Sequence, residues 1–279
     1  MKIQAEKWHA FGNDFILIDH PLEDQAGLSC LARALCNRHE GVGADGLVCF
    51  DRVEGDTRCR IFNMDGSEAE ISGNGVRCLA GFLKRKLPSE QTFKIHSMAG
   101  LKVLTFLRED PPLLWFRANM GKPDFRPAAL PADIDGESAQ RYPIIIDGCK
   151  LEINLVSLGN PHCVLFVSEF EWQDWMRLGQ QLESHPLFPR RTNVEFVRVI
   201  DPHNIGIRIW ERGVGKTFSS GTCSCASAAV SIQDGQARSP VQVHNEKGVL
   251  TVDWRPGDDI FVEGPTAPVW KGEFLWNAE

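Results

Sequence analysis

The chain has 279 residues, 43% of them hydrophobic, and a formal net charge of −7. That length suits one large domain or two of ordinary size, and an acidic balance without a basic block argues against nucleic-acid binding. No apolar run approaches the roughly 20 residues that cross a bilayer, and the N-terminus lacks the apolar core of a signal peptide. We therefore expect a soluble cytoplasmic protein that binds neither nucleic acid nor a membrane.

The predicted elements of the first half are short strands separated by glycine and polar turns. The strands are Asp14–Asp19, Gly46–Phe50, Thr57–Asn63, Thr92–Ser97 and Leu101–Leu107. A helix is predicted over Gly73–Lys86, with Val76, Leu79, Ala80 and Leu83 on one face. Its basic end, Leu83–Lys86, complements the helix dipole. One glycine-initiated helix among many strands is the expected content of this half.

The second half repeats this pattern after a proline-containing stretch, Ala118–Gly136, which is typical of a linker. Its predicted strands are His162–Val167, Val194–Ile200 and Ile205–Trp210, followed by a helix over Cys223–Gln233. The sequence therefore predicts an α+β fold with two lobes, residues 1–120 plus 263–279 and residues 121–262.

An internal repeat supports two related lobes. An offset of 148 residues places Arg60–Asn63 on Arg208–Glu211 and Ser72–Asn74 on Ser220–Thr222, and an offset of 147 places Phe11–Ile18 on Leu158–Leu165. We expect duplicated halves that face each other across a cleft, each contributing the same serine-glycine turn.

The two serine-glycine turns stand where predicted helices begin. A helix N-terminus offers unpaired backbone N–H groups and a partial positive charge, and glycine lets an anion approach them closely. The alternative is that Ser72 and Ser220 are ordinary helix N-caps, a role that serine fills well. Two such turns at matching places of a duplicated chain favour a carboxylate-binding site.

Further polar residues stand at corresponding strand ends. They are Asn13, Asn63, Asn160, His162, Asn193, Glu211 and Arg212. Asparagine is also a common turn residue, which is the alternative for each position taken alone. An arginine with several amides suits a zwitterionic substrate that carries a carboxylate and an ammonium group.

The nine cysteines are scattered and odd in number, as in a reducing compartment. Cys223 and Cys225 form a C-x-C pair, but no histidine-rich segment lies close to them in the sequence. We interpret them as small buried thiols of a helix and expect no metal and no cofactor.

Six stretches together resemble diaminopimelate epimerase. They are "HAFGNDFILID", "RHEGVGADG", "IFNMDGSEAEISGNGVRC", "LGNPHCV", "TNVEF" and "WERGVGKTFSSGTCSCA", in family order from His9 to Ala226. The resemblance implies two α/β lobes, each with a sheet or barrel wrapped around a central helix, and a homodimeric enzyme of lysine biosynthesis. It also implies inversion of an amino-acid α-carbon without pyridoxal phosphate, by one base and one conjugate acid on opposite faces.

The resemblance also implies roles for individual residues. It places the two proton-transfer groups at Ser72 and Ser220, with His162 and Glu211 assisting. It places the substrate contacts at Asn13, Asn63, Asn160, Asn193, Glu211 and Arg212, and the backbone donors at Gly73, Asn74, Gly221 and Thr222.

The chain departs from the family pattern at five positions. The family has cysteine where Ser72 and Ser220 stand, glutamine at Gly46, an acidic residue at Lys216 and glycine at Cys223. A cysteine thiol has a reference pKa near 8.5, and an alcohol as weakly acidic as water lies about 7 units higher. Forming the base from serine therefore costs about 10 kcal/mol more, unless a neighbour such as His162 activates the hydroxyl.

Three functions fit this pattern. The first is an isomerase acting on a diaminopimelate-like amino acid, impaired or inactivated if both thiols are missing. The second is a lyase that removes one Cα proton and expels a β-substituent, for which one base suffices. The third is an amino-acid-binding protein without catalysis. Cys223 is expected to lie on the helix flank, where it does not replace the base.

Overall fold

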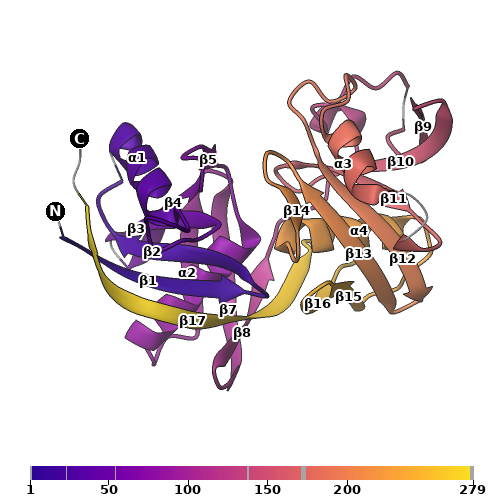
Figure 1. Cartoon of the computed structure of the whole chain (residues 1–279). Coiled ribbons are helices and arrows are strands. Elements are labelled where there is room, and N and C mark those ends of the chain that lie inside the picture. Colours follow the sequence, from indigo (N-terminus) through magenta and orange to yellow (C-terminus); the bar gives the residue numbers. More distant parts are fainter. Residues whose placement is uncertain (1, 23, 54, 137, 171–173, 277–279) are drawn as a thin grey trace. The chain divides into compact units, whose positions relative to one another are not determined.

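A computed structural model of the chain describes residues 2–22, 24–53, 55–136, 138–170 and 174–276. The chain divides into two compact units, and Figure 1 colours it along the sequence. Unit 1 comprises Met1–Asn119 and Glu263–Glu279, and unit 2 comprises Met120–Val262. No helix among the described residues is long and apolar enough to cross a membrane.

Unit 1 is a closed ring of strands around a helix. Its elements are β1 (Lys2–Ala10), β2 (Asn13–Asp19), α1 (Gln25–Cys36), β3 (Gly46–Val53), β4 (Asp56–Asn63), β5 (Glu68–Ala69), α2 (Gly73–Lys86), β6 (Thr92–Ser97), β7 (Gly100–Asp110), β8 (Leu113–Asn119) and most of β17 (Phe261–Leu275). The pairing order is β1, β2, β3, β4, β6, β7, β8 and β17, and β17 pairs back with β1. Ring closure leaves these strands without free edges.

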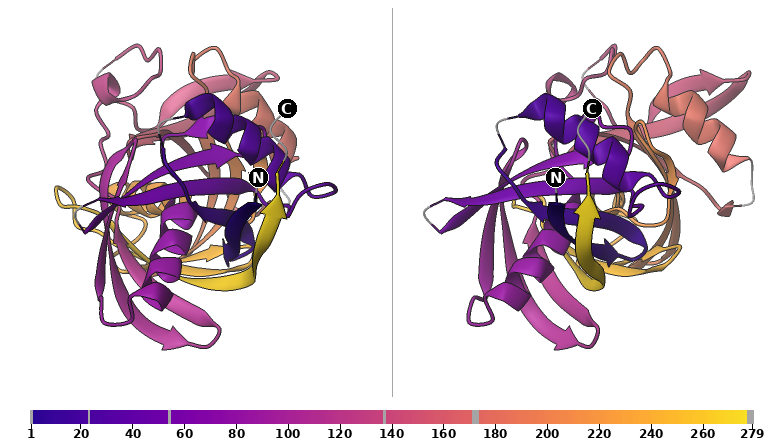
Figure 2. Two further views of the ribbon diagram at one scale, coloured as in Figure 1. Left: turned by 90° about the vertical axis from the view of Figure 1, so that its left-hand side faces the viewer. Right: turned by 60° about the vertical axis from the view of Figure 1, so that its left-hand side comes forward.

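Helix α2 lies inside this ring and contacts β1, β2, β3, β6, β7 and β8; the left view of Figure 2 shows it among the strands. Val76, Leu79, Ala80 and Leu83 are all buried, as the sequence predicts. The helix has the predicted bounds and carries Lys84, Arg85 and Lys86 in its last turn. Its close approach to β1 requires Gly81, because a Cβ there would lie 2.8 Å from the Trp8 ring.

Unit 2 has the same plan. Its elements are a 3-10 turn (Pro127–Ala129), β9 (Tyr142–Ile146), β10 (Cys149–Ser157), β11 (Pro161–Phe166), α3 (Trp175–Glu183), β12 (Asn193–Asp201), β13 (Asn204–Glu211), β14 (Gly215–Thr217), α4 (Gly221–Gln233), β15 (Val241–Asn245) and β16 (Gly248–Asp253). Helix α4 contacts β10, β11, β12, β13, β15 and β16. Its residues from Gly221 to Ser231 are all buried.

The strand pairings repeat between the units. β2 and β3 are parallel, and so are β4 and β6, whereas β1–β2, β3–β4, β4–β5 and β6–β7 are antiparallel. In unit 2, β11–β12 and β13–β15 are parallel, and β10–β11, β12–β13, β13–β14 and β15–β16 are antiparallel. The predicted α+β fold of two pseudo-symmetric lobes is confirmed.

Three local predictions differ from the structure. Each unit contains a second helix among its described residues, α1 and α3, where one helix per half was expected. α4 begins at Gly221, two residues before the predicted start. The stretch expected as a linker belongs to unit 2 from Met120 onwards, where Asp124 forms a β-bridge with Ser157.

Candidate active site

Helices α2 and α4 begin in the same way. Ser72 and Ser220 both have extended backbones, with φ and ψ of −132° and 117° and of −143° and 132°. Each serine carbonyl accepts the first helical hydrogen bond, from Val76 N at 2.9 Å and from Ser224 N at 3.0 Å. The first-turn amides of α2 and α4, which include those of Gly73, Asn74, Gly221 and Thr222, lack partners within their helices. Each unit therefore presents a helix end suited to an anion.

The two serine hydroxyls make different contacts. Ser72 Oγ accepts a hydrogen bond from Gly75 N at 3.1 Å, so this serine is an N-cap. Ser220 makes no side-chain cap hydrogen bond. Its Oγ donates to Glu211 Oε2 at 3.3 Å and lies 3.4 Å from Thr222 Oγ1. The capping role thus accounts for Ser72 but not for Ser220, whose hydroxyl hydrogen points at a carboxylate.

Glu211 ends β13 and faces the start of α4. Thr217 Oγ1 donates to its Oε1 at 2.6 Å, and Ser220 donates to its Oε2. Burial raises the pKa of the Glu211 carboxyl, and the two hydroxyl donors only partly offset this effect. A carboxylate with a raised pKa is a better proton acceptor than an exposed one, so Glu211 is suited to accept the hydroxyl proton of Ser220.

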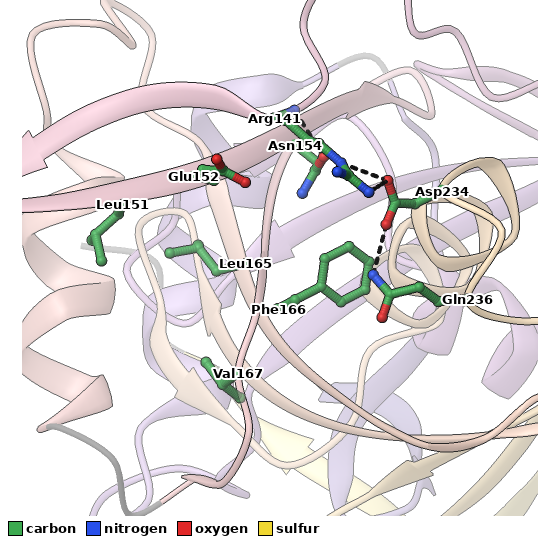
Figure 3. A pocket seen from close by; sticks show the side chains of 9 residues that line it. All are labelled: Arg141, Leu151, Glu152, Asn154, Leu165, Phe166, Val167, Asp234 and Gln236. Atoms are coloured by element: carbon green, nitrogen blue, oxygen red, sulfur yellow. Dashed lines mark hydrogen bonds and ion pairs between the residues drawn. The ribbon is translucent and has the colours of Figure 1, made fainter.

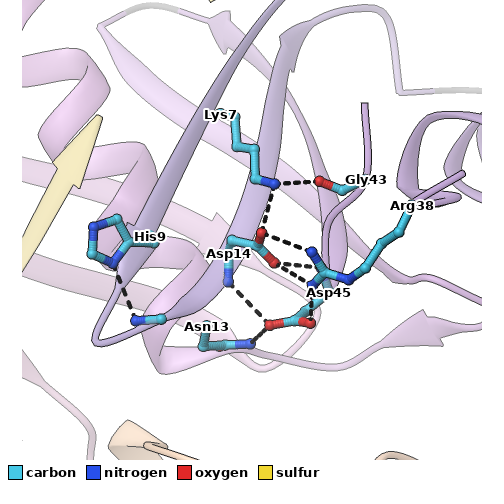
Figure 4. Close-up of polar contacts among 8 residues, drawn as sticks. Lys7, His9, Asn13, Asp14, Arg38, Gly43 and Asp45 are labelled. Carbon is cyan, nitrogen blue, oxygen red and sulfur yellow. Dashed lines mark hydrogen bonds and ion pairs between the residues drawn. The ribbon is translucent and has the colours of Figure 1, made fainter. Parts of the chain in front are cut away.

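In unit 1, a polar network fixes the amide of Asn13 (Figure 4). Asn13 Nδ2 donates to Asp45 Oδ2 at 2.8 Å, and Asn13 Oδ1 accepts from Asn74 Nδ2 at 3.0 Å. The Oδ1 atom of Asn74 in turn accepts from the buried guanidinium of Arg77 at 2.5 Å. The strand end that carries Asn13 is therefore tied through its side chain to the first turn of α2.

A partly buried ion-pair cluster adjoins this network. Asp14 binds Lys7 at 2.7 Å and Arg38 at 2.9 Å, and Arg38 also binds Asp45 at 2.7 Å. Burial of Asp14 opposes its ionisation, but hydrogen bonds from Arg38 and Lys7 outweigh that effect and lower the pKa of the carboxyl. The sequence analysis did not identify these supporting residues, although Arg38 and Asp45 lie within the motif "RHEGVGADG".

Asn63 and Gly46 pair across β4 and β3. Asn63 Nδ2 donates to Ser67 Oγ at 2.9 Å. A Cβ atom at Gly46 would lie 2.8 Å from the carbonyl oxygen of Phe62 and 2.9 Å from the ring of Phe15. The glutamine that the family resemblance implies at this position therefore does not fit without movement of the surrounding strands.

In unit 2, Asn193 holds the backbone at the end of β13. Its Nδ2 donates to the carbonyl of Pro161 at 2.9 Å, and its Oδ1 accepts from the Arg212 N–H at 3.0 Å. Asn193 is buried and Arg212 is partly buried. The amide thus fixes the turn from which the Arg212 side chain projects.

His162, Glu195 and Cys223 form a fully buried cluster. One potential ligand atom from each lies within 4.8 Å of the others. His162 Nδ1 lies 2.6 Å from Glu195 Oε1, and His162 Nε2 lies 3.0 Å from Asn160 Oδ1. Because both ring nitrogens already face oxygen atoms, the cluster is a hydrogen-bonded network and not a preformed metal centre.

His162 lies beside Cys223 in the fold, although no histidine-rich segment lies close to Cys223 in the sequence. The Ser220 and Glu195 side chains lie close enough to influence the pKa of the thiol. Folding, not sequence proximity, brings His162 and Glu195 to it, because β11 and β12 are neighbouring parallel strands packed against α4. Glu195 was missed in the sequence analysis, although it lies in the motif "TNVEF".

A separate surface cavity of about 260 Å³ lies in unit 2 (Figure 3). Arg141 and Gln236 both bind Asp234 beside it. Asp234 caps the C-terminal end of α4, the opposite end from Ser220. None of the residues that line this cavity belongs to the predicted site, so the cavity does not change the assignment.

Two duplicated units, each with a central helix enclosed by strands, define the fold class, which solved structures of low sequence identity share. A hydroxyproline epimerase from Agrobacterium vitis superimposes with a TM-score of 0.72 at 13% identity, over 98% of this chain and 92% of that one. A phenazine biosynthesis protein of the PhzF family from Bacillus anthracis gives 0.72 at 16% identity, over 99% and 100%. At such identities the likeness concerns the fold.

Sequence comparison identifies the family within this class. The family model "Diaminopimelate epimerase" matches residues 6–126 and 154–268. The chain is 39% identical to the diaminopimelate epimerase of Desulfitobacterium hafniense and 38% identical to that of Halothermothrix orenii, in each case over 99% of both chains. The chain belongs to the diaminopimelate epimerase family, a family of isomerases, and the predicted resemblance is confirmed.

Proposed function

We propose that this protein is a cofactor-independent isomerase that inverts the α-carbon of a diaminopimelate-like amino acid. Ser220 with Glu211 serves as the base on one face, and Ser72 serves as the proton donor on the other. The observation that carries the proposal is the hydrogen bond from Ser220 Oγ to Glu211 Oε2 at 3.3 Å. It gives the serine hydroxyl a partner that can take its proton.

The helix ends would bind the α-carboxylate of the substrate. The first-turn amides of Gly73, Asn74, Gly221 and Thr222 supply N–H donors, and both helix dipoles favour an anion. The distal polar groups of the substrate would be held by the side chains at the strand ends, namely Asn13, Asn63, Asn160, Asn193 and Arg212. The networks around Asn13 and Asn193 fix those amides before substrate arrives, which reduces the entropy lost on binding.

The proton steps balance without a free alkoxide at Ser220. As the Cα–H bond breaks, its proton passes to Ser220 Oγ while the hydroxyl proton of Ser220 passes to Glu211 Oε2. The electron pair left on Cα is stabilised by the carboxylate-binding amides. Ser72, whose Oγ is fixed by Gly75 N, then donates its hydroxyl hydrogen to the opposite face and regains a proton from water.

This route addresses the cost of replacing a thiol with a hydroxyl. A serine acting alone forms its anion about 10 kcal/mol less readily than cysteine. When Ser220 passes its hydroxyl proton to Glu211, the Glu211 carboxylate becomes the final proton acceptor on that face of the α-carbon. The hydroxyl oxygen of Ser72 instead accepts from Gly75 N, so we expect reprotonation on its face to be the slower step.

A lyase is the second candidate, because the two half-sites are chemically unequal. Of the two serines, Ser220 directs its hydroxyl at a carboxylate, whereas the hydroxyl oxygen of Ser72 accepts from Gly75 N. One base is sufficient to remove the Cα proton when a leaving group on Cβ departs with the electron pair. The same helix ends would stabilise the carbanion formed in that reaction.

One experiment separates these functions. The protein is incubated in D2O with LL-diaminopimelate, meso-diaminopimelate and a panel of 3-hydroxy amino acids, and the Cα proton is followed by NMR. Deuterium uptake with inversion supports the isomerase, and keto-acid or imine products support the lyase. Tight binding in calorimetry without either change contradicts both and identifies a binding protein.

A further inference from the structure

We propose that Cys223 and Glu195 form a second route by which Ser220 passes on its hydroxyl proton. This route runs from Ser220 through the Cys223 thiol to the Glu195 carboxylate, inside unit 2. This inference rests on the proposed role of Ser220 as the base. It assigns a function to Cys223, the thiol that stands where the family resemblance implies glycine, and to the buried Glu195 behind it.

The position of Cys223 relative to Ser220 follows from helix geometry. Ser220 is the N-cap of α4 and Cys223 lies three residues later, so their side chains share one helix face. The thiol is completely buried, and the Ser220 side chain lies close enough to influence its pKa. A thiol therefore remains near the candidate base, three residues further along α4.

Glu195 provides an acceptor on the far side of that thiol. Its Oε1 is held by His162 Nδ1 at 2.6 Å. Its Oε2 is buried and has no hydrogen-bond partner among the described residues, and one oxygen of Glu195, Cys223 Sγ and a ring nitrogen of His162 lie within 4.8 Å of one another. A buried carboxylate oxygen without a donor is costly, and the Cys223 S–H is the donor placed to satisfy it.

The relay balances as three linked transfers. The Cα proton passes to Ser220 Oγ, the hydroxyl proton of Ser220 passes to Cys223 Sγ, and the original thiol proton passes to Glu195 Oε2. The negative charge moves from Glu195 to the substrate α-carbon, and the reverse transfers return a proton to Cα.

The surroundings of Cys223 suit a relay and not a thiolate base. Burial, with the nearby carboxylates of Glu195 and Glu211, raises the pKa of the Cys223 thiol well above its ordinary value. The titratable groups that face it are these two carboxylates and His162, from β12, β13 and β11. The thiol therefore keeps its proton at rest and can pass one proton on as it receives another.

The test compares Cys223→Ala, which removes the relay atom, with Cys223→Ser, which keeps a group that can both donate and accept. The assay is deuterium incorporation at the α-carbon of LL-diaminopimelate in D2O. We expect Cys223→Ala to lower kcat by about tenfold or more with KM changed less than about twofold, as for loss of a proton-transfer group. Cys223→Ser should recover most of the lost kcat.

A matched control is Cys78→Ala, which removes an equally buried thiol from the other central helix, α2. It should leave kcat unchanged, and thermal unfolding of all three variants shows whether each is folded. A second readout needs no turnover. The infrared S–H stretching band that disappears in Cys223→Ala should move to higher frequency in Glu195→Gln, because an amide oxygen is a weaker acceptor than a carboxylate.

The outcomes separate the two proposals. If the wild-type protein exchanges the Cα proton and Cys223→Ala exchanges it with the same kcat, the relay is wrong and the proposed function stands. If Ala and Ser lower kcat equally and raise KM together, Cys223 has only a packing role. If the wild-type protein shows no exchange, the proposed function fails, and the relay fails with it even where the infrared band confirms the Cys223–Glu195 hydrogen bond.

Discussion

At the scale of single residues, the two half-sites use one amino acid for two tasks. Ser72 and Ser220 occupy equivalent helix starts and have similar backbone angles. The hydroxyl of Ser72 satisfies a helix amide, whereas that of Ser220 is directed to Glu211. The difference lies in their neighbours: position 211 of unit 2 carries a carboxylate, and the corresponding residue of unit 1 is Asn63. An amide cannot take up a proton as a carboxylate does.

The capping role of Ser72 predicts a specific stability change. Ser72→Ala removes the hydrogen bond to Gly75 N and should lower the free energy of unfolding by about 1 kcal/mol. Ser72→Asn, which also caps helices well, should recover most of this loss. Urea denaturation of the three proteins measures the differences. Equal stability of Ser72→Ala and wild type would show that the cap does not contribute.

Glu211 predicts a pH dependence of proton exchange. The base form is the carboxylate, and burial raises the pKa of Glu211. Activity that depends on this base should therefore rise with pH through an apparent pKa above the ordinary value for glutamate. Glu211→Gln should lower kcat/KM for Cα deuterium exchange by about 100-fold and abolish that limb of the pH profile. A variant that keeps the wild-type profile would remove Glu211 from the mechanism.

At the scale of elements, α2 was predictable and α1 and α3 were not. In α2 the serine cap, the apolar face from Val76 to Leu83 and the basic last turn all indicate the same helix. α1 carries comparable signals, an Asp24 cap and buried Leu28, Leu31 and Leu35, but no glycine turn marks its start. The partners of Asn13 and Cys223 could not be predicted, because strand pairing brings Asp45 and Glu195 to them from distant segments.

The Gly46 strand position gives a prediction at this scale. Gly46→Ala places a Cβ atom 2.8 Å from a backbone carbonyl, and we expect it to lower the free energy of unfolding by about 1–3 kcal/mol. Gly206→Ala is the matched control in β13, where the nearest atom to a new Cβ is the end of the Phe170 ring at 3.3 Å. Chemical denaturation of both variants should show the larger loss at Gly46. The reverse order would mean that β3 and β4 adapt readily, and that a glutamine at position 46 could be accommodated.

At the scale of the whole molecule, duplication was visible in the sequence and the ring topology was not. Offsets of 147 and 148 residues align three landmarks, and the structure places them on equivalent elements of the two units. The parallel pairs β2–β3 and β4–β6 join strands that lie far apart in the sequence. The register of each pair depends on which face of each strand is buried against α2. Local periodicity carries no information about such pairing, so the sequence predicted lobes but not closed strand order.

The proposed use of both units on one α-carbon leads to a final prediction. Reprotonation from Ser72 is the expected slower step, so Ser220→Cys alone should have little effect, whereas Ser72→Cys should raise the rate until proton removal on the Ser220 face becomes limiting. The double variant should convert LL-diaminopimelate to the meso form faster than the two single effects multiplied together, because about 10 kcal/mol separates the two acids at each position. Chromatographic separation of the stereoisomers gives the initial rates. Purely multiplicative single effects would indicate that the two serines act independently, and inversion by both serines would have to be abandoned.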